Sequence, residues 1–185
     1  MSKSDENQRK VAEFLLRIKA IQLSPENPFT WASGRKSPIY CDNRRILSHP
    51  EIRTFVRQLT TVEIEERYGK PEAIAGVATG GIALGALIAQ ELGLPFIYVR
   101  SSAKQHGTGQ RIEGDYSGFS SVFVIEDLVS TGKSSLSAVD SLRESGLEIK
   151  GLMAIFTYGF PDAVQRFKES DCSFFTLTDY PTMLE

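Results

Sequence analysis

The segment from Glu126 to Ser134 combines residue types that could hold a phosphorylated sugar. In order, it contains Glu126, Asp127, Leu128, Val129, Ser130, Thr131, Gly132, Lys133 and Ser134. Free backbone N–H groups at the start of a helix, together with three hydroxyl groups, can cradle a phosphate, and Gly132 lets the backbone approach that anion closely. The two carboxylates would repel phosphate, so we expect them to bind sugar hydroxyls. The alternative is that they only cap the helix, with no ligand.

Two better-known phosphate motifs are excluded. Gly132-Lys133-Ser134 matches the end of a P-loop, but the earlier glycine that this motif requires falls at Asp127. The segment 76–81 is close to a dinucleotide-binding fingerprint, but its middle glycine is replaced by Ala78 and no suitable acid follows about 20 residues later.

A long polar insertion occupies residues 101–117 and combines glycines with Lys104, His106 and Arg111. Loops of this length without secondary structure are uncommon inside compact domains and often serve as active-site lids. The composition favours a lid, and the alternative is a surface hairpin with no role.

Strands and helices alternate along the rest of the chain. Strands are expected at 73–78, 95–100, 121–126, 149–158 and 173–178, and helices at 4–21, 48–68, 81–92, 132–145 and 162–170. Residues 24–38 are expected to form a loop. The strands are almost continuously apolar, which is typical of a parallel sheet covered by helices on both faces. The sequence therefore predicts an α/β fold, and 185 residues suit a single domain.

The composition limits the possible partners. A net charge of -2 gives no reason to expect nucleic acid or an anionic membrane surface as a partner. The most apolar stretch, 76–99, is interrupted by polar residues, glycines and a proline, so we expect a buried core and no membrane span. The chain begins with polar and charged residues, which are unlike a signal peptide. Cys41 and Cys172 lie far apart in the sequence, which favours reduced thiols in a cytoplasmic protein.

Three motifs carry a resemblance to a known family. The strand followed by Glu-Asp, small polar residues, Thr-Gly and Ser resembles the phosphoribosyl-pyrophosphate motif of type I phosphoribosyltransferases. Residues 28–44 are similar to the N-terminal hood signature of the orotate phosphoribosyltransferases, and residues 98–109 resemble the mobile catalytic loop of that family. The motifs occur in the expected order, and the resemblance covers most of the chain.

The resemblance implies a type I phosphoribosyltransferase fold in one domain, 1–185. A central parallel sheet flanked by helices would form the core at about 50–160. A small N-terminal hood would come from about 1–45 together with the C-terminal segment, and a mobile catalytic loop from about 101–117.

The implied activity is a magnesium-dependent, reversible transfer of the 5-phosphoribosyl group from phosphoribosyl pyrophosphate to orotate. The products are orotidine 5′-monophosphate and pyrophosphate, in the biosynthesis of pyrimidines. Lys104, Asp127 and Glu126 would be catalytic. The binding of phosphoribosyl pyrophosphate would involve Arg100, Lys104, His106 and every residue from Glu126 to Ser134. Mg²⁺ would be carried by substrate oxygens and water, without a direct protein ligand.

The resemblance also implies a homodimer, in which Arg100, Lys104 and His106 complete the site of the neighbouring subunit. Ser130 would approach the pyrimidine. Some relatives end the strand after the phosphate helix with an arginine that binds the pyrimidine, whereas this chain has Phe156-Thr157-Tyr158-Gly159 there. Arg44 and Lys36 are therefore candidates for the orotate carboxylate, although either could be a solvated surface charge.

Two other functions remain open at this stage. A purine phosphoribosyltransferase would share the phosphate motif, but the hood signature and the loop with Lys104 and His106 argue against it. A regulator could keep the fold to sense phosphoribosyl pyrophosphate while binding RNA or DNA, but the slightly negative net charge argues against that.

Overall fold

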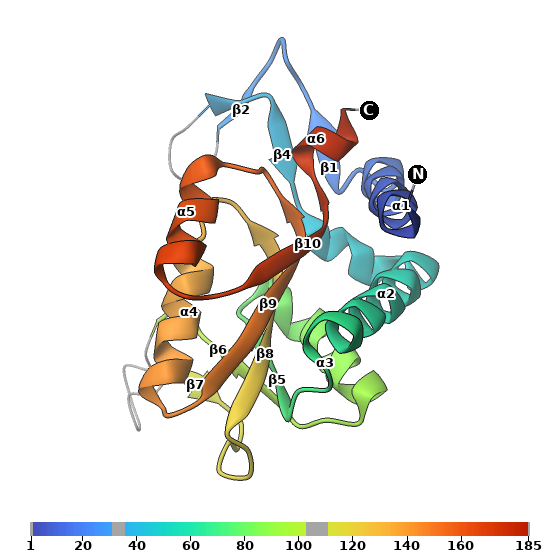
Figure 1. The fold of residues 1–185 in the computed structure, drawn as a ribbon. Coiled ribbons are helices and arrows are strands. Elements are labelled where there is room, and N and C mark those ends of the chain that lie inside the picture. The colour runs from blue at the N-terminus through green and yellow to red at the C-terminus, as the bar shows by residue number, and fades with distance from the viewer. Residues whose placement is uncertain (1, 31–35, 103–110, 185) are drawn as a thin grey trace.

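Six apolar segments pair into one central sheet, which Figure 1 shows between two groups of helices. The computed structural model describes residues 2–30, 36–102 and 111–184. The strand order is β10-β9-β8-β5-β6-β7. The bounds are β5 (Ala73–Val77), β6 (Phe96–Val99), β7 (Ile112–Glu113), β8 (Ser121–Val129), β9 (Glu148–Thr157) and β10 (Phe174–Asp179). All neighbours pair in parallel except β6 and β7, which are antiparallel. The predicted α/β fold is confirmed.

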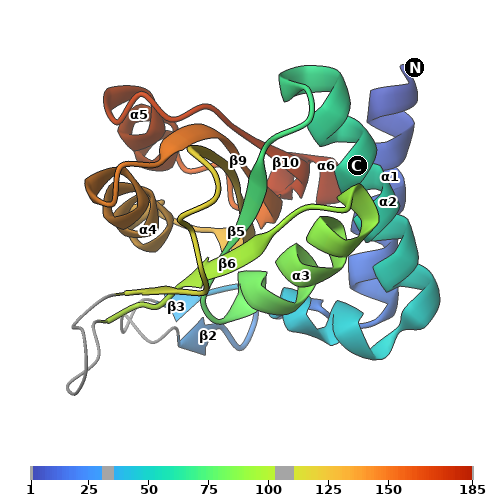
Figure 2. The same cartoon turned by 90° about the horizontal axis from the view of Figure 1, so that it is seen from below.

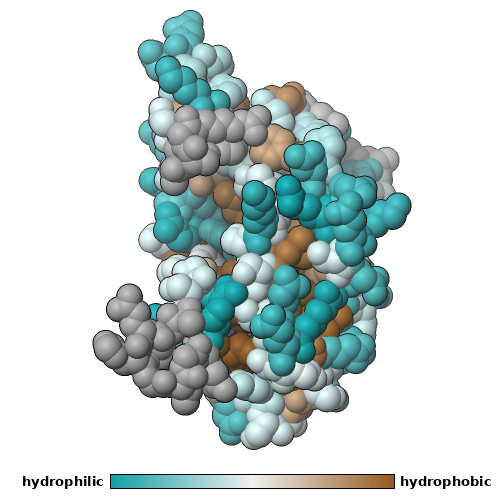
Figure 3. Space-filling model, turned by 90° about the vertical axis from the view of Figure 1, so that its left-hand side faces the viewer, coloured by the Kyte–Doolittle hydropathy of each residue, from teal (hydrophilic) through white to brown (hydrophobic). Residues whose placement is uncertain are grey.

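Helices cover both faces of this sheet, as Figure 2 shows. On one face lie α1 (Lys3–Arg17), α2 (Pro50–Tyr68) and α3 (Gly80–Leu92), and on the other lie α4 (Lys133–Glu144) and α5 (Pro161–Glu169). The outer face of α4 and α5 is mostly hydrophilic, with apolar side chains visible between the polar ones (Figure 3). Because both faces are covered, the central strands β5 and β8 are buried along most of their length.

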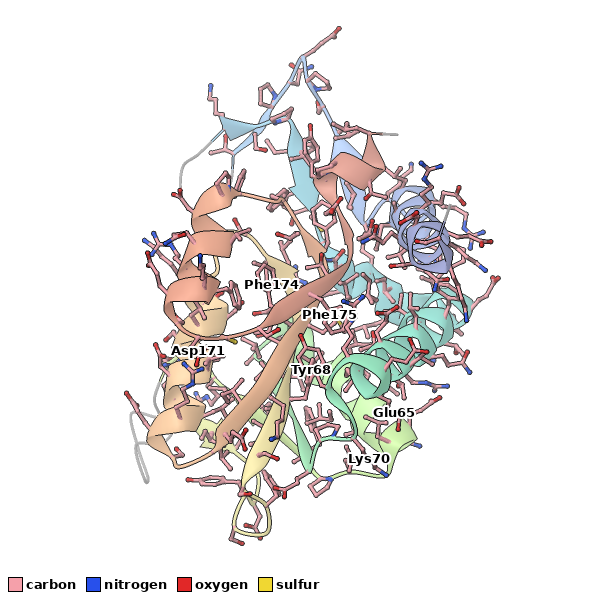
Figure 4. All side chains as sticks on the ribbon, viewed as in Figure 1. Glu65, Tyr68, Lys70, Asp171, Phe174 and Phe175 are labelled. Atoms are coloured by element: carbon pink, nitrogen blue, oxygen red, sulfur yellow. The ribbon has the colours of Figure 1, made fainter. Side chains whose placement is uncertain are left out.

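Aromatic side chains join the sheet to both helix layers. Figure 4 shows Phe174 and Phe175, two successive residues of β10 whose side chains point to opposite faces, and Tyr68 at the end of α2. The ring of Phe175 lies 6.1 Å from that of Tyr68, and the ring of Phe174 lies 4.1 Å from that of Phe167 in α5. The hydrophobic core is therefore divided by the sheet into two clusters.

A smaller part of the chain lies above the carboxyl ends of the strands in Figure 1. It contains β1 (Ile21–Leu23), β2 (Phe29–Thr30), β3 (Lys36–Ser37) and β4 (Ile39–Cys41), which we call the hood strands. β1 pairs with β4 and β2 with β3, both antiparallel. A 3₁₀-helix, η1 (Asn43–Ser48), leads back to the core, and α6 (Tyr180–Met183) lies beside the hood strands. The exact division into hood and core stays a prediction.

Several predicted boundaries were wrong. The helix expected to reach Ile21 ends at Arg17, because Lys19 adopts a left-handed conformation (φ 56°) and Ile21 enters β1. The expected loop at 24–38 contains β2 and β3, and the insertion at 101–117 contains β7, which extends the sheet. Within the described ranges, no helix combines the length and the apolar composition needed to cross a bilayer.

Candidate active site

The two acids of the predicted sugar-binding segment lie inside a strand. β8 continues to Val129, because Glu126 lies opposite Ala154 of β9 and Val129 lies opposite Thr157. The prediction that this strand ends at Glu126 is therefore wrong by three residues. Successive side chains of a strand point to opposite faces of the sheet, so Glu126 and Asp127 point to different sides.

Glu126 points toward α4 and is only 5% exposed. One carboxylate oxygen accepts a hydrogen bond from the Asp127 N–H (3.0 Å), and the other accepts one from the Ser135 hydroxyl (3.1 Å). Burial raises the pKa of Glu126 well above its usual value, and the negative charge of Asp127 raises it further. Ser135 was not among the predicted site residues, although its place in the first turn of the helix after the acids was a usable signal.

Asp127 is half-buried and faces the start of α3. A methyl group on Gly80 would overlap the carboxylate of Asp127, and one on Gly81 would overlap the carbonyl oxygen of Ile125 in β8. At Gly81 the contact is with backbone, so only glycine fits there and α3 begins directly against the carboxyl end of β8, whereas a side chain at Gly80 would require the Asp127 carboxylate to move. The turn before α3, whose Ala78–Thr79 peptide bond is cis, therefore lies next to Asp127.

The predicted phosphate cradle is the turn between β8 and α4. Gly132 precedes the helix in a left-handed conformation (φ 79°), and a side chain there would strike the ring of Phe167. α4 has no side-chain cap, so the alternative that the acids only cap this helix is wrong. The Leu136 N–H bonds to the Gly132 carbonyl (2.9 Å), and the N–H groups just before it in the helix have no intrahelical acceptor. The exposed or half-exposed side chains of the cradle are Ser130, Thr131, Lys133 and Ser134.

Leu128 and Val129 lie between the acids and the cradle. Val129 is fully buried, and its carbonyl oxygen accepts a hydrogen bond from the Thr157 hydroxyl (3.0 Å). Leu128 packs against the core cluster on the α3 side of the sheet. Their side chains therefore belong to the core, and these two residues could reach a ligand mainly through their backbone.

The hood strands are joined to this site by Asn43, at the start of η1. Its side-chain N–H donates to the carbonyl oxygen of Asp127 (2.6 Å), and its side-chain oxygen accepts from the Cys41 thiol (3.2 Å). Asn43 is 1% exposed. Burial raises the pKa of the Cys41 thiol, with the charge of Asp127 as the next cause. Sequence reasoning missed Asn43, because a contact across 84 residues leaves no local pattern.

The two candidates for the orotate carboxylate are placed differently. Arg44, 55% exposed, forms an ion pair with Asp42 (2.6 Å), which holds the pKa of that carboxyl below its usual value. The hydrogen bond to Asp42 and the charge of Asp42 raise the pKa of Arg44, and the charge of Asp127 adds to them to a smaller extent. Lys36 is exposed on β3. The role of both residues stays a prediction.

Arg100 follows β6, at the same edge of the sheet as the acids and the cradle. Its guanidinium lies 3.5 Å from the carboxylate of Glu113 in β7. Lys104 and His106, which the resemblance places at pyrophosphate, lie outside the described residues. The described part of the insertion includes β7, which rejoins the sheet, and Arg111, whose side chain bonds to the Arg100 carbonyl and to α4.

A large hollow lies elsewhere, between α1 and α2. Its volume is about 550 Å³, and its lining includes Phe55, Leu59 and Arg67 but none of the predicted site residues. Its size alone does not connect it to the chemistry of the acids and the cradle.

Comparisons with known proteins agree with this arrangement. The family described as phosphoribosyl transferase domain matches residues 42–175. The chain is 55% identical over 174 residues to an orotate phosphoribosyltransferase of Phocaeicola vulgatus, covering 94% of this chain and 82% of that protein. It is 49% identical over 178 residues to one of Listeria monocytogenes, with 96% and 85% covered.

A solved structure gives the same result. The crystal structure of orotate phosphoribosyltransferase from Aeropyrum pernix superposes with a TM-score of 0.82 at 28% identity, covering 94% of this chain and 96% of that one. Sequence and fold thus both match over nearly the whole length. The chain belongs to the orotate phosphoribosyltransferase family of phosphoribosyltransferases.

Proposed function

We propose that this protein transfers the 5-phosphoribosyl group from phosphoribosyl pyrophosphate to orotate, reversibly, as a step of pyrimidine biosynthesis. The observation that carries the proposal is the position of the Asp127 carboxylate. It lies against the start of α3, at Gly80, at the carboxyl end of the strand that leads into the cradle at the start of α4. A ribose bound there would have its 5-phosphate in the cradle and its hydroxyls near the acids. The names of the relatives support orotate as the acceptor.

The charges of the site suit this reaction. The leaving pyrophosphate gains negative charge, and cationic side chains such as Arg100 and Lys104 would stabilise it. The C1′ atom of the ribose gains positive charge, which the nearby carboxylate of Asp127 would stabilise. Glu126 is buried on the other face of the strand and accepts a hydrogen bond from the Asp127 N–H, which fixes the Asp127 backbone. It would also assist in binding the ribose hydroxyls. A loop that closes over the substrate would exclude water, which otherwise hydrolyses the activated sugar.

Magnesium is part of the proposal. Within residues 2–30, 36–102 and 111–184, no three His, Cys, Asp or Glu side chains converge as ligands for a metal ion. The oxygens of Glu126 already accept hydrogen bonds, and we expect the ion to be held by substrate oxygens and water, without a direct protein ligand. This donor set fits an ion that arrives with substrate and keeps several waters. When bound, magnesium would neutralise charge on the pyrophosphate oxygens.

The proposal also includes a homodimer, with Arg100, Lys104 and His106 of one subunit acting in the site of its partner, and a cytoplasmic location. Both cysteines, Cys41 and Cys172, are free and buried, which suits a reducing compartment.

Orotate consumption tests the function directly. The protein is mixed with orotate, phosphoribosyl pyrophosphate and Mg²⁺, and the loss of orotate absorbance is followed, with EDTA as the matched control. Turnover that requires the metal is the expected result. Turnover with guanine, hypoxanthine or xanthine, but not with orotate, would identify a purine enzyme. Binding of phosphoribosyl pyrophosphate without turnover of any base would identify a sensor. Either outcome contradicts the proposal.

The dimer has its own test. Variants of Lys104 and of Asp127, each inactive alone, are mixed and assayed for recovered activity. If loop and cradle come from different subunits, mixed dimers contain one intact site and regain activity. If both come from one subunit, mixing restores nothing.

A further inference from the structure

Arg111 connects three elements of the site. Its backbone carbonyl accepts from the Arg100 N–H (2.8 Å), and its guanidinium Nε donates to the Arg100 carbonyl (2.9 Å). Its Nη1 donates to the carbonyl (3.2 Å) and hydroxyl (2.9 Å) of Ser137 and to the hydroxyl of Ser141 (2.9 Å). One side chain thus joins the end of β6 to α4, the helix that begins with the cradle.

The contacts on α4 lie on a face that leads to the cradle. Ser134, Ser137 and Ser141 are three and four residues apart, so they lie along one side of the helix. Ser134 and Arg111 also line a cavity of about 70 Å³ together with Ala78, from the turn before α3. Arg111 therefore contacts the side of α4 that continues from the cradle, and it lies beside the turn before α3.

The chemistry of arginine suits this place. Its planar guanidinium offers five N–H donors in a fixed fork, whereas a lysine offers one compact ammonium group. The acceptors lie in different directions from the guanidinium: one is the Arg100 carbonyl at the end of β6, and the others lie along α4. A lysine could satisfy part of this set but would not hold the two elements in a fixed relation.

We propose that Arg111 is a positioning residue for the transfer reaction. By joining the backbone of Arg100 to α4, it fixes the point from which the Arg100 side chain extends toward the site of the neighbouring subunit. Arg100 then meets the pyrophosphate end of a phosphoribosyl pyrophosphate molecule that the neighbouring subunit's cradle holds. The proposal rests on the proposed function and its homodimer, and it assigns Arg111 no direct contact with substrate.

The test compares Arg111→Met with a matched control, Arg143→Met. Arg143 also joins α4 to a neighbouring segment, through the carbonyls of Ser170 (2.7 Å) and Asp171 (2.8 Å) in the turn between α5 and β10. Figure 4 places Asp171 far from the hood strands. Arg111→Met should raise the KM for phosphoribosyl pyrophosphate about tenfold, with kcat changed less than about threefold, since a tenfold change corresponds to about 1.4 kcal/mol. Arg143→Met should lower the thermal midpoint without changing KM.

A second variant separates positioning from direct contact. Ser137→Ala combined with Ser141→Ala removes acceptors of Arg111 but leaves its charge in place. We expect this pair to raise KM in the same direction as Arg111→Met, and Arg111→Lys to give only partial rescue. An unchanged KM in the serine variant, with a raised KM in Arg111→Met, would mean that Arg111 contacts substrate and would overturn the proposal. An unchanged KM in Arg111→Met would overturn it too.

Calorimetric binding of phosphoribosyl pyrophosphate distinguishes this proposal from the proposed function. If the unaltered protein does not bind the compound, the proposed function fails. If it binds, and Arg111→Met binds equally well, only the positioning role fails. Weaker binding by Arg111→Met, with normal binding by Arg143→Met, is the expected result.

Discussion

Replacing Glu126 by glutamine removes a buried charge while nearly keeping the shape of the side chain. Both hydrogen bonds can survive, because the amide oxygen can accept from the Asp127 N–H and the amide nitrogen can donate to the Ser135 hydroxyl. The carboxylate, in contrast, is buried beside a second acid, and burial raises its pKa in the folded protein. We therefore expect Glu126→Gln to increase the stability of the protein at pH 8.

The sign of the pH dependence follows from proton binding. With a raised pKa, the folded protein binds a proton that the unfolded chain has lost, so the stability that Glu126 contributes is fully present below the usual value of 4.5. It falls as the pH rises toward the folded pKa, by about 1.4 kcal/mol for each pH unit between the two pKa values. Glutamine does not titrate. The advantage of the variant should therefore grow above pH 4.5 and level off at the folded pKa.

Urea denaturation from pH 4 to pH 8, at one protein concentration, measures this advantage. Glu13→Gln, at an exposed position of α1, is the matched control and should stay within about 0.5 kcal/mol of the unaltered protein. The same Glu126→Gln protein should lose activity, with kcat lowered about 10- to 100-fold, the effect of about 1.5–3 kcal/mol for one charged hydrogen bond. A pH-independent difference, or a less stable variant at pH 8, would refute the reasoning.

Three further substitutions test other parts of the site. In a urea titration, Gly81→Ala should lower the free energy of unfolding by about 1–3 kcal/mol, because the added methyl group meets a backbone carbonyl of β8. Gly118→Ala is the control, and it should leave the free energy of unfolding nearly unchanged because open space surrounds Gly118. Asn43→Ala leaves the Asp127 carbonyl without its donor, so urea titration should show a loss of about 1–3 kcal/mol, and no loss would mean that water replaces the amide. Lys104→Ala should lower kcat by about 10²- to 10³-fold in the orotate assay with an unchanged thermal midpoint, and an unchanged kcat would remove Lys104 from the mechanism.

The sequence predicts the layers of this fold well, because each layer leaves a local pattern. The apolar run of β8 and the helical spacing of α2 can be read from a few neighbouring residues. The ends of elements are harder to predict. Leu128 and Val129 continue β8 because β9 offers paired hydrogen-bonding groups beside them, and no feature of the residues themselves indicates this pairing.

The candidate site divides in the same way. The acids and the cradle are contiguous in sequence, so their residue types were sufficient to predict a sugar-phosphate site. Asn43 bonds to a backbone carbonyl 84 residues away in the sequence. Arg111 bonds to two serines, the farther of which is 30 residues away. In the sequence, nothing distinguishes a backbone carbonyl or a serine that bonds to a distant side chain from one that bonds only to water. Only the folded arrangement identifies these two residues as connections.

The contact between α3 and β8 has a consequence for how such a protein can diversify. No side chain fits between Gly81 and the backbone of β8, so the wall beside Asp127 has a position that no single substitution can reshape without moving the backbone. Variation next to Asp127 is therefore expected at neighbouring positions that already carry side chains. A change at Gly81 itself would require a new path for the chain between β5 and α3.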